Sequence, residues 1–180
     1  MSSQKTIAFI GLGSNLGASK TVLKQGWELL GKQKGVCLKT LSPPYLSSPV
    51  GMTSNYWFTN AVGEMQVDCS PDELLQILLA VEKRLGRVRD DQKQGYQDRV
   101  IDLDLIYYDA LVTDSPRLTI PHPRRAERLF VLAPLVAIAP GFVDPETGLS
   151  VSTIYQNLLD SIARGQAEKQ EISIGTWSED

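Results

Sequence analysis

The chain has 180 residues, a length typical of one domain, and its 42% hydrophobic and 22% charged residues fit an ordinary globular protein. Its formal net charge of −3 argues against general nucleic-acid binding, and its longest apolar stretch, residues 129–139, is too short to cross a bilayer. Two cysteines cannot build a disulfide framework, and the first residues do not resemble a signal peptide. We therefore expect a cytoplasmic protein with neither a nucleic-acid nor a membrane partner.

The first half of the chain alternates short apolar runs with turn residues. Apolar runs of this length that end in glycine or proline indicate strands, and apolar residues that recur every three or four positions indicate a helix. The predicted elements, in order, are a strand at 6–12, a helix that carries Leu23, Trp27 and Leu30 and ends near Gly31 or Gly35, a strand at 36–41, a Pro- and Ser-rich loop at 42–51, and a strand at 60–67.

The clearest helix signal begins at Ser70. Serine is a good N-cap, Pro71 suits the first helical position, and Glu73 completes a capping box. Gly86 then ends the helix. Its buried stripe is predicted to consist of Leu74, Leu78, Val81 and Leu85.

The second half of the chain begins with a polar, Gln-rich stretch that lacks hydrophobic periodicity and is expected to be a mobile loop. Pro134 interrupts a later helical pattern. The predicted elements, in order, are the loop at 87–98, a strand at 99–108, a turn at 109–110, a return strand at 111–112, a helical region at 125–139, a turn at 144–148, a helix at 152–164, and a tail at 165–180 that is expected to be partly disordered.

Positive charge is concentrated in the middle of the chain. Ten of the 18 Lys and Arg residues lie between Lys83 and Arg128, and none lies between Thr40 and Glu82. Asp90, Asp91, Asp98, Asp102 and Asp104 lie inside this cationic stretch. A polyanion that brings its own metal ions needs such a mixture, since arginine binds phosphate oxygens and carboxylates bind the metal. A solvated, salt-bridged surface explains the charge pattern equally well.

Asp102 and Asp104 alternate with apolar residues inside one predicted strand. Side chains two positions apart face the same way, so these carboxylates would lie roughly 6.6 Å apart on one face. Aspartate is disfavoured in strands, and two on one face repel each other, so we expect something to compensate. Divalent cations, typically ~3.5–4 Å apart in two-metal sites, would do so, and pairing with nearby arginines is an equal alternative. Strict alternation places Arg99 on the opposite face, so the strand must begin or bulge after it.

His122 is the single histidine of the chain and lies between Pro121 and Pro123. Three arginines follow within six residues, which favours hydrogen bonding to a phosphate oxygen, although a purely structural histidine is the more common case. Two nucleotide-binding motifs fail. Residues 11–16 lack the third glycine of a dinucleotide fingerprint, and residues 17–21 lack the Gly-Lys step of a Walker A loop. Any nucleotide binding is therefore expected to use side chains.

Several short blocks occur in a characteristic order along the chain, and none of them is specific alone. They are Gly13–Leu16, Ser48–Pro49, Phe58–Ala61, Glu82 with Gly86–Arg89, Arg99–Leu105, Leu118–Pro123 and Arg128–Leu132. Together, over about residues 6–160, they resemble the 6-hydroxymethyl-7,8-dihydropterin pyrophosphokinase family of folate biosynthesis. The implied reaction transfers diphosphate from ATP to the hydroxymethyl oxygen of the pterin and releases AMP.

The resemblance also implies roles for individual residues. Asp102 and Asp104 match aspartates that hold two Mg²⁺ ions, and Arg87 and Arg99 match arginines that close over the triphosphate. These four and His122 form the expected catalytic set. The expected ATP-binding residues are Glu82, Arg89, Leu105, Arg117, Thr119, His122 and Arg128. The expected pterin-binding residues are Ser48, Pro49, Phe58, Asn60 and Phe130, of which the two phenylalanines sandwich the ring.

The implied fold is a ferredoxin-like α+β domain over residues 1–164, with helices on the faces of a largely antiparallel sheet. We expect a monomer that takes small-molecule substrates and a loop at 90–98 that closes on ATP. The chain departs from the family in this loop, where Tyr96–Asp98 stands in place of a frequent Trp-Gly-Pro. Two alternatives stay open: a γ-phosphoryl kinase of another small alcohol, which would release ADP, and a non-catalytic protein that binds nucleotide or pterin.

Overall fold

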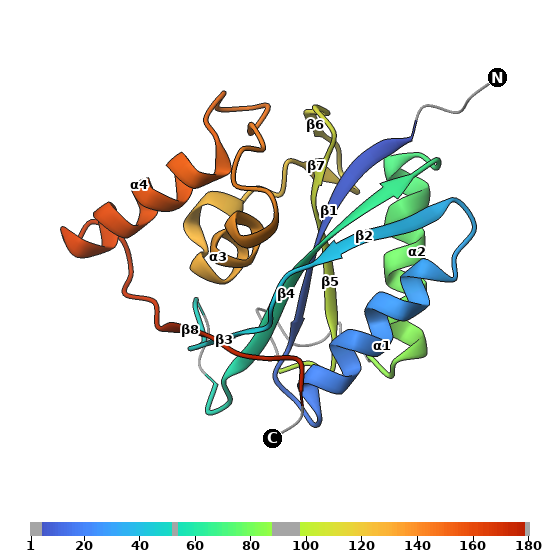
Figure 1. The fold of residues 1–180 in the computed structure, drawn as a ribbon, viewed down its shortest axis with the longest axis horizontal. Helices are drawn as coiled ribbons and strands as arrows, with labels where there is room; N and C mark the ends of the chain where they lie inside the picture. Colours follow the sequence, from blue (N-terminus) through green and yellow to red (C-terminus); the bar gives the residue numbers. More distant parts are fainter. Residues whose placement is uncertain (1–4, 52–53, 88–97, 179–180) are drawn as a thin grey trace.

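A computed structural model describes residues 5–51, 54–87 and 98–178. Its centre is a six-stranded antiparallel sheet with the order β5-β1-β4-β3-β8, in which β2 also pairs with β4 (Figure 1). The strands of this sheet are β1 (Thr6–Ser14), β2 (Val36–Leu41), β3 (Tyr45–Ser47), β4 (Phe58–Val67), β5 (Asp102–Tyr108) and β8 (Ile172–Ile174). A separate antiparallel pair consists of β6 (Thr113–Asp114) and β7 (Thr119–Ile120).

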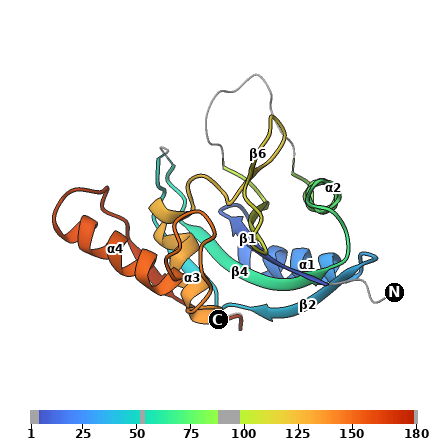
Figure 2. The same cartoon turned by 90° about the horizontal axis from the view of Figure 1, so that it is seen from above.

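Helices cover both faces of the sheet (Figures 1 and 2). One side carries α1 (Ser19–Gly31) and α2 (Pro71–Arg84), and the other carries α3 (Leu129–Ile138) and α4 (Val151–Ala163), preceded by the 3₁₀ turn η1 (Arg125–Glu127). This arrangement confirms the predicted α+β architecture with an antiparallel sheet.

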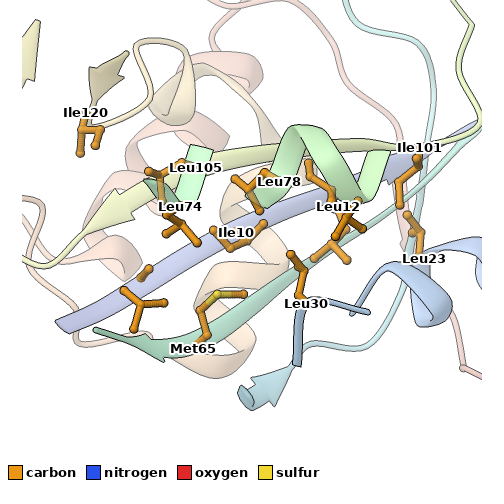
Figure 3. Close-up of a cluster of buried hydrophobic side chains, with 14 residues drawn as sticks. Ile10, Leu12, Leu23, Leu30, Met65, Leu74, Leu78, Ile101, Leu105 and Ile120 are labelled. Carbon is orange, nitrogen blue, oxygen red and sulfur yellow. The ribbon is translucent and has the colours of Figure 1, made fainter. Parts of the chain in front are cut away.

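The alternation of side chains along β1 divides the core into two layers. Ala8, Ile10 and Leu12 are buried with α1 and α2, in the cluster that Figure 3 shows, while Phe9 is buried with α3 and α4 on the other face. On β5, Leu103 and Leu105 join the first cluster and Ile106 joins the second. Asp102 and Asp104 therefore lie on the α3 side of the sheet.

The predicted start of α2 is confirmed in detail. The Ser70 hydroxyl accepts a hydrogen bond from the Glu73 amide, and the Glu73 carboxylate accepts one from the Ser70 amide at 2.7 Å, which forms the capping box. Leu74, Leu78 and Val81 are buried as expected.

Other predicted boundaries were wrong. The strand expected at 99–108 begins at Asp102, because Arg99 and its neighbours turn to meet the loop after β1. This start confirms the prediction that the strand begins or bulges after Arg99. The helix expected at 125–139 is divided into η1 and α3 at Arg128, whose backbone is extended. The return strand expected at 111–112 forms instead at 113–114.

Two segments without predicted structure contribute strands. The Pro- and Ser-rich loop contains β3, and the C-terminal segment contains β8, which pairs with β3. The loop expected to close on ATP falls mostly on residues 88–97, outside the described residues. Within the described ranges, no helix is long and apolar enough to span a membrane.

Candidate functional site

The floor of the site is formed where β1 pairs with β5. Gly11 lies opposite Asp104 and Gly13 lies opposite Asp102. A Cβ atom at Gly11 would come within 3.2 Å of the Ile106 side chain, and one at Gly13 within 3.2 Å of the Asn60 amide oxygen. The glycines thus leave room above the sheet at the point where the two carboxylates lie. From the sequence, the two glycines were part of a failed dinucleotide motif and Gly13 also belonged to a family block, but this role was not predicted.

A pocket opens over this floor, with a cavity volume of about 60 Å³. Its walls come from β1, β3, β4, β5 and α3, from the segment between β3 and β4, and from the segment that precedes β5. Eight of the predicted site residues line it together: Ser48, Phe58, Asn60, Arg99, Asp102, Asp104, Arg128 and Phe130. Both predicted carboxylates therefore lie beside the residues that were predicted to bind the pterin.

Asp102 is held by two arginines. Arg87 Nη1 contacts Asp102 Oδ1, and Arg99 Nη1 donates to Asp102 Oδ2 at 2.6 Å. Glu82 lies behind Arg87, is buried, and accepts hydrogen bonds from Arg87 and from the Leu103 amide at 2.7 Å. Arginine pairing, one of the two explanations offered for the carboxylates, is thus present at Asp102.

Asp104 has a different environment. Burial and the neighbouring negative charge of Asp102 raise the pKa of the Asp104 carboxyl to about 7, although Arg128 and Arg99 oppose this increase. Among the described residues, no group of three His, Cys, Asp or Glu side chains gathers to hold a metal ion. Two carboxylates with hard oxygen donors still suit Mg²⁺, because protein sites for this ion typically add substrate phosphates and water to one or two carboxylates.

The two predicted ring-binding phenylalanines both carry an arginine over one face. Arg99 Cζ lies 5.7 Å from the centre of the Phe58 ring, and Arg128 Cζ lies 5.4 Å from that of Phe130. Such cation–π contacts are favourable on their own. Both arginines line the pocket, whose volume is below the roughly 300 Å³ of ordinary ligand sites.

Polar groups of β3 and β4 complete the pocket. Asn60 is buried and donates through Nδ2 to the Ser47 hydroxyl at 2.9 Å. Ser47 was not predicted, and its position next to Ser48 in a Ser-Ser pair was the available signal. Pro49 lies between Ser48 and Val50, both of which line the pocket, but is not itself among the lining residues.

His122 lies close to the charged centre but does not line the pocket. Burial, followed by the positive charge of Arg128, lowers the pKa of the His122 imidazole to about 4. Its Nδ1 accepts a hydrogen bond from the Arg124 amide at 3.1 Å, so the neutral ring carries its proton on Nε2. The His122 amide donates to Ile106 O at 2.9 Å, which fixes this residue beside β5.

Arg125 anchors the segment that joins His122 to Arg128. It is buried, donates from Nη2 to Asp144 Oδ1 at 3.0 Å, and makes a second contact through Nε. The Tyr107 hydroxyl also donates to Asp144, at 2.7 Å, and these hydrogen bonds hold the pKa of the Asp144 carboxyl well below its usual range. Arg125 Nη1 donates to His122 O at 3.3 Å. Sequence reasoning had not separated this arginine from its neighbours.

Three further residues that were predicted to bind ATP, Leu105, Arg117 and Thr119, do not line the pocket. The Leu105 side chain is buried in the α1 and α2 core, on the opposite face of the sheet from Asp104. Arg117 is exposed between β6 and β7, and the Thr119 hydroxyl donates to Asp114 at 2.7 Å. Arg89 lies outside the described residues.

Asn15 was missed as an individual site residue. Its Oδ1 accepts from the Arg99 amide at 2.8 Å, and its Nδ2 donates to Asp98 Oδ1 at 2.6 Å. The Asn15 amide also donates to Arg99 O at 3.2 Å. The loop after β1 thus holds the backbone from which the Arg99 side chain reaches Asp102.

Comparison with known proteins identifies the family of the chain. The family model described as 7,8-dihydro-6-hydroxymethylpterin-pyrophosphokinase (HPPK) matches residues 9–140. The chain belongs to this family. The sequence prediction of the family is therefore confirmed.

Relatives at moderate identity support the HPPK assignment. A 2-amino-4-hydroxy-6-hydroxymethyldihydropteridine pyrophosphokinase of Methylorubrum extorquens is 38% identical over 138 residues, which are 77% of this chain and 85% of that protein. The Bacillus subtilis protein of the same name is 38% identical over 132 residues, 73% of this chain and 77% of that protein.

Longer proteins contain the same HPPK region. The folic acid synthesis protein fol1 of Pneumocystis carinii is 38% identical over 152 residues, 84% of this chain but 20% of that protein. The solved structure of wild-type Plasmodium falciparum HPPK-DHPS is similar in fold, with a TM-score of 0.71 at 12% identity over 90% of this chain and 46% of that chain.

Proposed function

We propose that this chain transfers the diphosphate group of ATP to the hydroxymethyl oxygen of 6-hydroxymethyl-7,8-dihydropterin and releases AMP, as a step of folate biosynthesis. The pterin hydroxyl oxygen forms a bond to the β-phosphorus and releases its proton to water. The bond from that phosphorus to the oxygen bridging to the α-phosphorus breaks, and AMP leaves with the bridging oxygen. The observation that carries the proposal is the single pocket that joins the pair Asp102 and Asp104, with its arginines, to the ring-binding residues Phe58 and Phe130.

We assign Mg²⁺, in two ions, to Asp102 and Asp104. The fit rests on two neighbouring carboxylates on one face of β5. The pKa of Asp104 is raised by burial and then by the negative charge of Asp102, and a bound cation would offset that charge. When bound, the ions neutralise charge on the phosphate oxygens of the transferred group.

The arginines and His122 are assigned to the phosphates. Arg87 and Arg99 exchange Asp102 for phosphate oxygens when the nucleotide binds, since guanidinium groups bind phosphate as readily as carboxylate. Arg128 lines the same pocket. The neutral His122 ring donates its Nε2 proton to a phosphate oxygen. Glu82 acts through Arg87 and the backbone of β5.

The pterin is assigned to the apolar end of the pocket. In the free protein Arg99 lies over the Phe58 ring and Arg128 over the Phe130 ring. Once the arginines leave these rings, Phe58 and Phe130 stack on the two faces of the flat pterin. The Asn60 amide pairs with the polar edge of the ring, and Ser48 and Pro49 close that edge. We also assign Arg89, Arg117 and Thr119 as nucleotide contacts, and we assign Leu105 a contact through its backbone.

The deciding experiment mixes the protein with ATP, Mg²⁺ and 6-hydroxymethyl-7,8-dihydropterin and analyses the nucleotides. AMP that requires the pterin and disappears on chelation of the metal supports the proposal. ADP would identify a γ-phosphoryl kinase instead, and the absence of any product would contradict catalysis. We further propose a cytoplasmic monomer without a nucleic-acid partner, and the acidic pI of about 5.2 supports the last of these points.

A further inference from the structure

We propose that the C-terminal strap, residues 165–178, positions the two walls of the pterin pocket through Gln170 and Glu171, so that Gln170 is a positioning residue for the reaction. The inference rests on the proposed function. The strap follows α4 and passes beneath α3 to β3 (Figure 1). It lies beyond residues 9–140, which the family model matches, so the match itself assigns it no role.

Gln170 holds the backbone on both sides of Arg128. Its Nε2 donates to Glu127 O at 2.7 Å, and its Oε1 accepts from the Leu129 amide at 2.9 Å. Arg128 is the N-cap of α3 and gives no side-chain capping hydrogen bond, so Gln170 supplies a cap that the helix's own sequence lacks. Phe130 follows in the first turn of α3. Gln170 therefore fixes the segment that carries both Arg128 and Phe130.

The next residue holds the opposite wall. The Glu171 amide donates to the Ser48 hydroxyl at 3.2 Å, and the Ser48 amide donates to Glu171 O at 3.0 Å. Beyond it, β8 pairs with β3 in the register Ser47 with Ile172. Two consecutive strap residues thus join the Ser48 wall to the Arg128 wall.

The far end of the strap is fastened to the body of the protein. The Gly175 amide donates to Pro44 O at 2.8 Å, and Trp177 Nε1 donates to Ser42 O at 2.9 Å. Lys20 of α1 donates to Ser178 O at 3.2 Å. These contacts keep the strap in register with β3, so the distance between the two walls is set by the strap and not only by the sheet and α3.

The test compares Gln170→Ala with Gln156→Ala, which removes an exposed amide of α4 that donates to Asp160. Loss of two hydrogen bonds to the backbone around Arg128 is expected to lower kcat/KM for the pterin about tenfold, while the control stays at the wild-type value. Gln170→Glu keeps an acceptor for the Leu129 amide, is expected to have a smaller effect, and replaces Gln170→Ala if that variant does not fold.

A double-mutant cycle with Arg128→Lys separates positioning from general stability. If Gln170 acts through Arg128, the loss caused by Arg128→Lys is smaller in the Gln170→Ala background than in the wild type. Additive losses, or a lower Tm with unchanged kcat/KM, would overturn the proposal. Wild-type protein that forms no AMP would contradict the proposed function instead, and the strap is then tested by the pterin dissociation constant of the same variants from a fluorescence titration.

Discussion

The carboxyl group of Asp104 is buried beside Asp102, and both burial and repulsion raise its pKa to about 7. In the unfolded chain the same group titrates near 3.8. Between these values the folded protein binds more protons than the unfolded chain, so the Asp104 contribution to stability declines as the pH rises from about 4 to 7. The negative charge of ionised Asp104, which suits a metal ligand, therefore destabilises the metal-free protein.

We expect Asp104→Asn to raise the stability of the metal-free protein at pH 8 by about 1–3 kcal/mol, because the amide removes the buried negative charge without changing the shape. The gain should be much smaller at pH 5. Thermal denaturation in EDTA at both pH values measures it, with the exposed Asp68→Asn as the control. A lower Tm at pH 8 would contradict the argument. The variant should also lose nearly all activity.

His122 gives a direct readout of phosphate binding, because it is the single histidine of the chain. Its pKa of about 4 is caused by burial and then by Arg128. The triphosphate of ATP would place negative charge nearby and is expected to raise this pKa by about one unit or more. An NMR titration of the imidazole with and without ATP measures the change. An unchanged pKa would remove His122 from the phosphate site.

At the scale of elements, the loop after β1 is expected to control the start of β5. Asn15 holds Asp98 and Arg99 through hydrogen bonds of 2.6 and 2.8 Å. Asn15→Ala leaves the Arg99 amide without this acceptor, so we expect a stability loss of about 1–3 kcal/mol. Because Arg99 is displaced, kcat/KM for ATP should fall as well.

Chemical denaturation and steady-state kinetics measure the two effects of Asn15→Ala. The matched control is Asn157→Ala, an exposed amide on α4. A variant that loses stability but keeps kcat/KM would show that Asn15 stabilises the fold without positioning Arg99.

Local patterns predicted the elements whose signals are contained in a few neighbouring residues. The capping box of α2 is an example, since Ser70 and Glu73 satisfy each other within one turn. The start of β5 was harder to predict because it depends on Asn15, which is 84 residues from Arg99. β3 and β8 were missed because each is three residues long and is formed by pairing with distant strands.

At the scale of the whole molecule, the sequence indicated which residues belong to the site but not how they are arranged in space. The spacing of Asp102 and Asp104 indicated one face of a strand, and the structure places them opposite Gly13 and Gly11. No spacing rule indicated that Gln170 would cap α3, because this contact needs the complete path of the chain through α4. For Leu105 the spacing rule was sufficient, because its position in the strand, next to Asp104, already places its side chain in the core.

The arrangement also predicts that the two substrates bind cooperatively. Arg99 pairs with Asp102 and lies over the Phe58 ring, so the same side chain touches the metal and pterin ends of the pocket. Phosphates compete with Asp102 for Arg99, and Mg²⁺ competes with Arg99 for Asp102. Binding of both would move Arg99 away from the Phe58 ring and free that face for the pterin. Because coupling energies of this kind are about 1–3 kcal/mol, we expect a non-hydrolysable ATP analogue with Mg²⁺ to tighten pterin binding about 5- to 150-fold.

Fluorescence titration of the pterin with and without the analogue measures this coupling. In Arg99→Ala the Phe58 face is already open. The variant without nucleotide should therefore bind the pterin about as tightly as the wild type does with the analogue. The ratio of the variant's pterin affinities with and without the analogue should fall toward one. Arg164→Ala, at the exposed end of α4, should keep the wild-type ratio. Equal coupling in Arg99→Ala and the wild type would mean that the nucleotide acts on the pterin pocket through contacts other than the Arg99 guanidinium, because that group is then absent from both ends of the pocket.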